Sequence, residues 1–294
     1  MMIKVYLFLN AILNIWLMSF FWQYAIPILQ GWGIELCGAG FLAWLGLPSS
    51  CMKYLWAAVS VLLPAVLAQL PSVQHWFCYM LGARKLEGIQ GMRIQEAMNV
   101  ACAHADVEPE RFNLYMKYGE EINAFTCGKN NVIVYTGASS VLSIPDLSGI
   151  IAHELGHLKN GDSSQSITLY LMGLLPNKFM EVLQFVADFF YFGRRWGMVF
   201  AIAGYVLSII CCVFRFILTI PFFIAAVTCG FNGGEKNADK YACEIGLGMY
   251  LYSALSIIKA KSNRQAPLRE ELINGYGTHE ERLNDILACS KDSL

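Results

Sequence analysis

The chain has 294 residues, of which 56% are apolar and only 15% are charged. Its mean hydropathy is +0.46, whereas an ordinary soluble domain has about 25% charged residues. The formal net charge of −1 excludes a strong overall field that would recruit nucleic acid. The composition therefore indicates a membrane protein or an unusually apolar globule, with no nucleic-acid partner.

The charged side chains are concentrated in two segments. Of the 43, 34 lie in residues 84–162 and 235–294. Two water-facing segments therefore alternate with two apolar ones. We expect an N-terminal membrane hairpin in residues 1–83 and a second membrane block in residues 163–234. The two polar segments would form the halves of one water-facing domain.

The N-terminal segment predicts two membrane spans. Residues 5–34 and 54–83 carry no formal charge, and a span needs about 20 apolar residues. The simplest interpretation is a hairpin with spans at about 5–29 and 54–76. Basic residues follow the second span directly: Arg84, Lys85 and Arg93. The positive-inside rule then places the polar domain in the cytoplasm.

The second apolar block predicts about two further spans, near residues 166–190 and 197–229. The first is the weaker prediction because it contains Lys178, Glu181 and Asp188. With both, the chain is a multi-pass protein of the cytoplasmic (inner) membrane.

The first polar segment changes in pattern along its length. Apolar residues between Ile94 and Ala105 recur at helical spacing. Three strand-like runs follow at Phe112–Tyr118, Ile122–Thr126 and Val132–Thr136, separated by turns that contain glycine. We expect a small antiparallel sheet beside a helix.

A second helix is predicted from Ser143, which starts a capping-box pattern, to Gly161. It contains His153-Glu154-Leu-Gly-His157, and the spacing of four places both imidazoles on one face, where they could grip one metal ion. Glu154 falls in the apolar stripe of this helix, which is costly without a partner. Zinc and the water it activates would be such a partner, with Glu154 moving the proton to the leaving amine.

Zinc hydrolysis needs a third protein ligand. A histidine six residues after His157 is excluded, because Ser163 occupies that position. Glu181 is one candidate, and Glu235 is the better one because it begins the second polar segment. Asp239 lies one turn later on the same helix face, where it could accept a hydrogen bond from the far nitrogen of a ligand histidine.

The chain resembles the HtpX-type membrane zinc metallopeptidases, relatives of the CAAX prenyl proteases. The matching motifs are Ile122–Gly128, Val132–Gly137, His153–Asp162 and Glu235–Asp239. They occur in the family's order, within about residues 85–290. Two apolar segments precede the predicted sheet and an apolar block separates the last two motifs, as in that family.

The resemblance implies an α+β, mostly α, gluzincin-like protease domain attached to a multi-pass membrane part. It implies that His153, His157 and Glu235 bind one Zn²⁺ per chain and that Glu154 is the general base. One polar segment (84–162) would then hold the first half of the protease domain, and the other (235–294) the second half.

The resemblance also assigns substrate-binding groups. It implies an edge strand against which an extended peptide adds, formed by Asn123, Ala124 and Phe125. The family's late histidine and arginine have a counterpart in His279 and Arg282, although the usual proline is absent and the spacing is shortened. Either residue could donate to the oxyanion, worth about 10²–10³ in rate. A surface histidine at a helix start is the alternative for His279.

Three functions remain open on the sequence alone. The first is a zinc endopeptidase that cuts membrane or misfolded polypeptides for quality control. The second is a specialised processing protease of the prenyl-peptide type, although those relatives have more spans. The third is a catalytically inactive membrane scaffold with a structural metal, against which Glu154 argues, since a structural zinc site needs no base.

Overall fold

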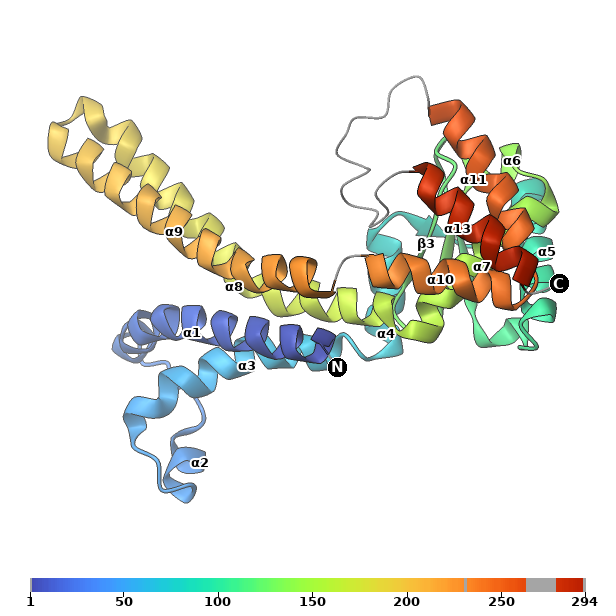
Figure 1. The fold of residues 1–294 in the computed structure, drawn as a ribbon. Coiled ribbons are helices and arrows are strands. Elements are labelled where there is room, and N and C mark those ends of the chain that lie inside the picture. The colour runs from blue at the N-terminus through green and yellow to red at the C-terminus, as the bar shows by residue number, and fades with distance from the viewer. Residues whose placement is uncertain (1, 230–231, 263–278, 293–294) are drawn as a thin grey trace. The chain divides into compact units, whose positions relative to one another are not determined.

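The computed structural model describes residues 2–229, 232–262 and 279–292. The chain divides into two compact units, each assembled from two segments distant in sequence (Figure 1). The first unit comprises Met1–Leu67 and Thr168–Thr228, and the second comprises Ala68–Ile167 and Cys229–Leu294.

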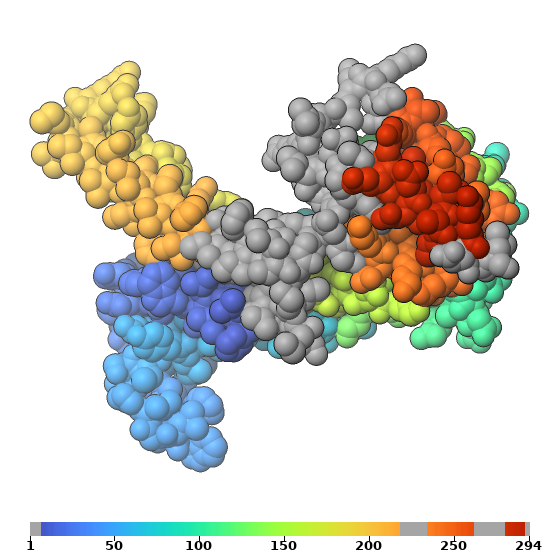
Figure 2. Space-filling model, viewed as in Figure 1, coloured from blue at the N-terminus to red at the C-terminus, as the bar shows by residue number. Residues whose placement is uncertain are grey.

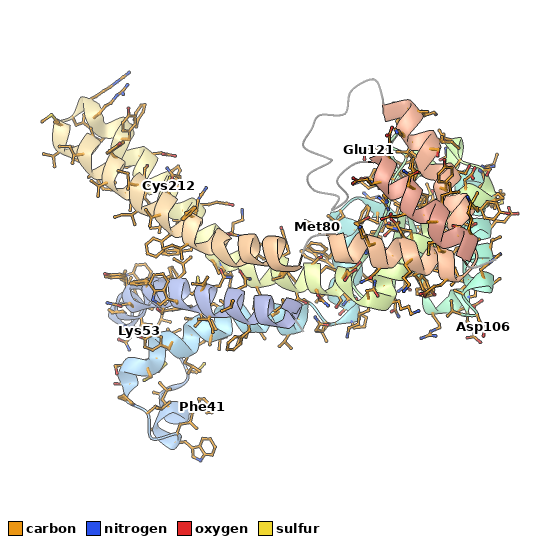
Figure 3. The ribbon with its side chains drawn as sticks, viewed as in Figure 1. Phe41, Lys53, Met80, Asp106, Glu121 and Cys212 are labelled. Carbon is orange, nitrogen blue, oxygen red and sulfur yellow. The ribbon has the colours of Figure 1, made fainter. Side chains whose placement is uncertain are left out.

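The first unit is helical in its described residues. Its elements are α1 (Met2–Gly31), α2 (Ala39–Trp44), α3 (Met52–Leu67), most of α8 (Asp162–Phe192) and α9 (Met198–Cys229). A polar contact joins α1 to α3, in which Trp22 Nε1 donates to Ser60 Oγ at 2.9 Å. Large apolar side chains such as Phe185 and Val199 are exposed, and sticks project from α8 and from the first part of α9, where Cys212 is labelled, in Figure 3. Large exposed apolar surfaces mark sites of contact with a membrane or with another protein.

Three of the described helices are long and apolar enough to cross a membrane, at Leu7–Gly31, Ser49–Leu67 and Met198–Ile217. They correspond to three of the four predicted spans. The second span differs from its predicted range, because α3 ends at Leu67 and a new helix begins at Pro71. Proline at the first helical position lacks the N–H that would continue the preceding helix.

The fourth predicted span, residues 166–190, lies within one continuous helix, α8, but is not among the three apolar candidates. Its charges explain the difference. Lys178 and Glu181 form an exposed ion pair at 2.6 Å, and Gln184 binds both Asp188 on its own helix and Ser208 on α9. The helix is long enough to span, but part of its surface is polar.

The second unit is an α+β assembly, mostly helical, around one apolar core. Its helices are α4 (Pro71–Met80), α5 (Gly88–His104), α6 (Thr136–Val141), α7 (Ile144–Asn160), α10 (Asn232–Glu244), α11 (Gly248–Ser262) and α13 (His279–Asp292). Its strands are β1 (Ala83–Arg84), β2 (Asn113–Lys117), β3 (Ala124–Cys127) and β4 (Asn131–Tyr135). Helices α5 and α7 each contribute five buried apolar residues to this core, and ten residues of the central helix α7 are buried. In Figure 2, α13 (red) covers part of α10 and α11 (orange).

The sheet has the order β1-β2-β4-β3 and is mixed, so the prediction of an antiparallel sheet was wrong. The strands lie close to the predicted runs, but β4 pairs parallel with β2 and antiparallel with β3. The reason is the burial of β4, in which Val132, Ile133 and Val134 have no exposed surface. A strand that is apolar on both faces takes a central position, which places β3 at the edge of the described sheet.

Two glycines of α7, Gly149 and Gly156, allow the backbones of α11 and α10 to pack directly against it. A Cβ at Gly156 would lie 2.8 Å from Ala238 Cα on α10, and one at Gly149 would lie 2.4 Å from Leu251 N on α11. The ends of α7 match the predicted signals. Ser143 Oγ accepts a hydrogen bond from the Asp146 N–H, and Gly161 ends the helix with a φ of 79°. The close crossing at Gly156 brings the first turn of α10 beside the histidines.

Candidate metal centre

Three side chains from α7 and α10 converge on one point. The Nε2 atoms of His153 and His157 lie 3.2 Å apart. Glu235, in the first turn of α10, places its Oε2 3.4 Å from His153 Nε2 and its Oε1 3.3 Å from His157 Nε2. One ligand atom from each of the three residues lies within 4.8 Å of the other two.

The far nitrogen of each imidazole faces a carboxylate. Asp239 Oδ1 lies 2.7 Å from His153 Nδ1, and Asp162 Oδ2 lies 3.0 Å from His157 Nδ1. A proton shared at Nδ1 directs Nε2 of each ring toward the common point. The sequence predicted this position for Asp239. The matching role of Asp162 was missed, although the residue was part of a quoted motif, because it follows the helix-ending Gly161 and lies off the helix face.

Arg282 of α13 binds the carboxylates of Asp239 and Glu235. Its Nε lies 2.9 Å from Asp239 Oδ2 and one terminal nitrogen lies 2.8 Å from Asp239 Oδ1, a two-bonded fork. The same terminal nitrogen lies 3.3 Å from Glu235 Oε2. Arg282 is buried, so these charge-assisted bonds are shielded from water. His279 begins α13, but its side chain lies outside the described residues.

The carboxylates make the centre a strong cation site. Burial disfavours the charged ring of His153, but its hydrogen bonds with Asp239 and Glu235 outweigh this effect and raise its pKa to about 9. Burial acts the same way on His157, whose bonds with Asp162 and Glu235 raise its pKa to about 10. Burial also opposes ionisation of Glu235, yet both histidines hold its pKa far below the usual range. The site therefore favours positive charge, as protons or as a metal ion that replaces them.

Glu154 lies beside the ligands and is buried. Burial raises the pKa of this carboxyl, and the neighbouring histidines and a hydrogen bond with Thr126 lower it only in part. A raised pKa brings a carboxyl nearer to the range in which it exchanges protons at neutral pH. Thr126 belongs to β3 and its hydroxyl also bonds Ser163, so the edge strand touches Glu154 directly.

The donor set fits zinc. Two imidazole nitrogens and one carboxylate oxygen are the ligands of many catalytic zinc sites. Tetrahedral bonds of 2.0–2.1 Å separate such ligands by about 3.3 Å. The two Nε2 atoms lie 3.2 Å apart, Glu235 Oε1 lies 3.3 Å from His157 Nε2, and its other oxygen, Oε2, lies 3.4 Å from His153 Nε2. The alternative third ligand, Glu181, instead pairs with Lys178.

The family model of peptidase family M48 matches residues 89–282. The chain belongs to peptidase family M48. The match begins in α5, includes the three main strands of the sheet, the histidine motif and Glu235, and ends at Arg282. No solved structure matches the chain. M48 peptidases are zinc metallopeptidases, so membership makes this chain a hydrolase of that type, and it confirms the resemblance expressed by the sequence motifs.

Proposed function

We propose that the chain is a membrane-embedded zinc endopeptidase that hydrolyses peptide bonds of membrane or misfolded polypeptides. The observation that carries this proposal is the convergence of His153, His157 and Glu235 beside the buried Glu154. Zinc bound there would polarise the scissile carbonyl and make a water molecule more acidic. His153 and His157 would bind it through Nε2, with Asp239 and Asp162 fixing the rings.

Glu154 is proposed to move the proton. It would take a proton from the attacking water and deliver it to the leaving amine, which is general base and then general acid catalysis. Burial raises the pKa of this carboxyl, which makes it a stronger proton acceptor and so supports its role as the base. Thr126 would hold the carboxyl in place.

The edge strand β3 is proposed to bind the substrate. On its outer side no other strand pairs with it in the described part of the chain. An extended peptide can add there through main-chain hydrogen bonds, which makes sequence selectivity modest. The contact of Thr126 with Glu154 would bring such a peptide to the catalytic group.

The membrane setting would define the substrates. We propose a multi-pass arrangement in the cytoplasmic (inner) membrane, supported by three apolar helices. The basic residues Arg84, Lys85 and Arg93 favour a cytoplasmic centre. An enzyme held there meets membrane proteins first, and one that binds main chain selects unfolded segments. Both properties suit quality control.

A single substitution tests the proposal. Glu154→Gln keeps the size of the side chain but removes the proton acceptor, so cleavage of casein and of a membrane-protein substrate should fall by about 10²–10⁴-fold with zinc content unchanged. Glu181→Gln, on the exposed surface of α8, is the matched control and should remain active. Equal activity of wild type and Glu154→Gln would refute the proposal. A wild-type protein that binds zinc but cleaves nothing would be a scaffold.

A further inference from the structure

A lysine is held over two aromatic rings beside the edge strand. Lys117 Nζ lies 4.8 Å from the ring centroid of Tyr135 and 5.7 Å from that of Phe125. The two rings are themselves 6.1 Å apart. The three residues come from the adjacent strands β2, β4 and β3, and Lys117 is in register with Tyr135. They form one continuous group on one face of the sheet, which we name the Lys117 platform.

The platform lies on the opposite face of β3 from Glu154. Ala124 packs in the core with α7, and Thr126 bonds Glu154. Because side chains alternate along a strand, Phe125 faces the other way. A peptide that adds to β3 alternates in the same manner. Every second substrate side chain would therefore face the Lys117 platform.

The charge of Lys117 has no counter-ion in the described part of the chain, where no carboxylate lies within salt-bridge distance of its ammonium. Lys178, Lys236 and Lys259 each have such a partner. Contact with ring faces holds an ammonium group without neutralising it. Neighbouring strands are about 4.8 Å apart, so a glutamate or aspartate opposite Phe125 could extend over the ring toward the ammonium.

We propose that the Lys117 platform is a substrate subsite that selects an acidic side chain at one position of the bound polypeptide. The inference rests on the proposed function, because it requires a peptide on β3. The aromatic rings hold the stem and ammonium of Lys117, and the ammonium supplies the charge that complements the substrate.

The test is a cleavage profile of the full-length protein in detergent. A mixture of peptides from a digested proteome is the substrate, and mass spectrometry reads the cleaved sites. The wild type should show Asp and Glu enriched at one fixed position from the scissile bond. Lys117→Ala should lose this enrichment, Lys117→Arg should keep it, and Lys117→Glu should replace it by Lys and Arg. For a matched pair of peptides with Glu or Gln at that position, the wild-type kcat/KM ratio should be about three- to fivefold, as for a partly exposed ion pair, and about one in Lys117→Ala.

Controls separate the subsite from the catalytic centre. Lys129→Ala removes an exposed lysine from the turn between β3 and β4 and should leave the profile unchanged. The Gln peptide should still be cleaved by Lys117→Ala, which shows that the variant is folded. A wild type without acidic enrichment, or a Lys117→Ala profile equal to it, overturns the subsite while cleavage still depends on Glu154. A wild type that cleaves no peptide contradicts the proposed function, and the subsite falls with it.

Discussion

Arg282 connects the last helix to the metal centre through a fork that only a guanidinium can make. It holds both oxygens of Asp239, which in turn faces His153. A lysine at this position would retain the charge but could not form two parallel bonds. We therefore expect Arg282→Lys to lower zinc affinity by about 10-fold, in the range typical of groups that orient metal ligands. Competition with a chromophoric chelator measures this affinity.

The matched control for Arg282 is Lys236→Ala. Lys236 also links α10 to α13, through an exposed ion pair with Asp285 at 3.4 Å, whereas Arg282 is buried and binds the carboxylate that faces His153. Its loss should leave zinc affinity unchanged, because exposed ion pairs contribute little. If Arg282→Lys bound zinc as tightly as wild type, Arg282 would not be needed to orient Asp239 and His153.

Glu235 is the ligand on which the proposed site depends most. Without it, two imidazoles remain, and two ligands do not hold a catalytic zinc ion. We expect Glu235→Ala to lose stoichiometric zinc, measured by elemental analysis of the purified protein. Glu181→Ala should retain one zinc per chain. Stoichiometric zinc in Glu235→Ala would mean that another side chain completes the site.

Sequence spacing identified the residues of the site that share a helix. His153 and His157 are four residues apart, and so are Glu235 and Asp239, so the helical period alone predicts their common faces. The roles of Asp162 and Arg282 were not predictable in this way. Asp162 follows a left-handed glycine, and Arg282 reaches Asp239 from a separate helix. Both depend on tertiary packing, which residue spacing does not encode.

At the scale of elements, the crossing of α7 and α10 sets the geometry of the centre. A methyl group at Gly156 would lie 2.8 Å from Ala238 Cα, and backbone cannot rotate away as a side chain can. Gly156→Ala should therefore push α10 outward, destabilise the protein by about 1–3 kcal/mol and weaken zinc binding by displacing Glu235. Thermal unfolding in detergent and zinc titration measure the two effects.

Gly40→Ala provides the comparison for Gly156. Gly40 lies in α2, and a Cβ there would meet nothing within 4 Å. The substitution should be neutral or slightly stabilising, since alanine is the better helix former. An unfolding temperature of Gly156→Ala equal to that of wild type would show that α7 and α10 do not cross as closely as described.

The positions of the strands could be predicted from the sequence, but their pairing could not. Alternation and glycine turns located all three long strands to within about two residues. The expectation that all of them pair antiparallel was wrong, because β2 and β4 are parallel and pairing is a tertiary property. The burial of β4 gave it the central position, and its hairpin with β3 then left β3 at the edge. Likewise, length alone predicted a span across Pro71, where the structure ends one helix and begins another.

At the scale of the whole molecule, one shared ion restricts the topology. His157 and Glu235 can bind the same metal only if the chain between them crosses the membrane an even number of times. The first 20 residues of α9 have a mean hydropathy of 2.2, so this helix is expected to cross. Helix α8 must then cross as well, despite its charges, and the turn between them at Gly193–Arg195 is expected on the far side.

Inserted epitope tags measure this arrangement. We expect a tag after Asp106, in the exposed loop that follows α5 (Figure 3), and a tag at the C-terminus to be accessible from the cytoplasmic side. A tag after Gly197 should be accessible only from the opposite side. If all three tags were on the same side, α8 and α9 would form a hairpin that does not cross, and the metal centre could still form. If the first two tags were on opposite sides, the histidines and Glu235 would be separated by the bilayer. No common ion could then bind, because ligands about 3.3 Å apart cannot lie across an apolar layer about 30 Å thick.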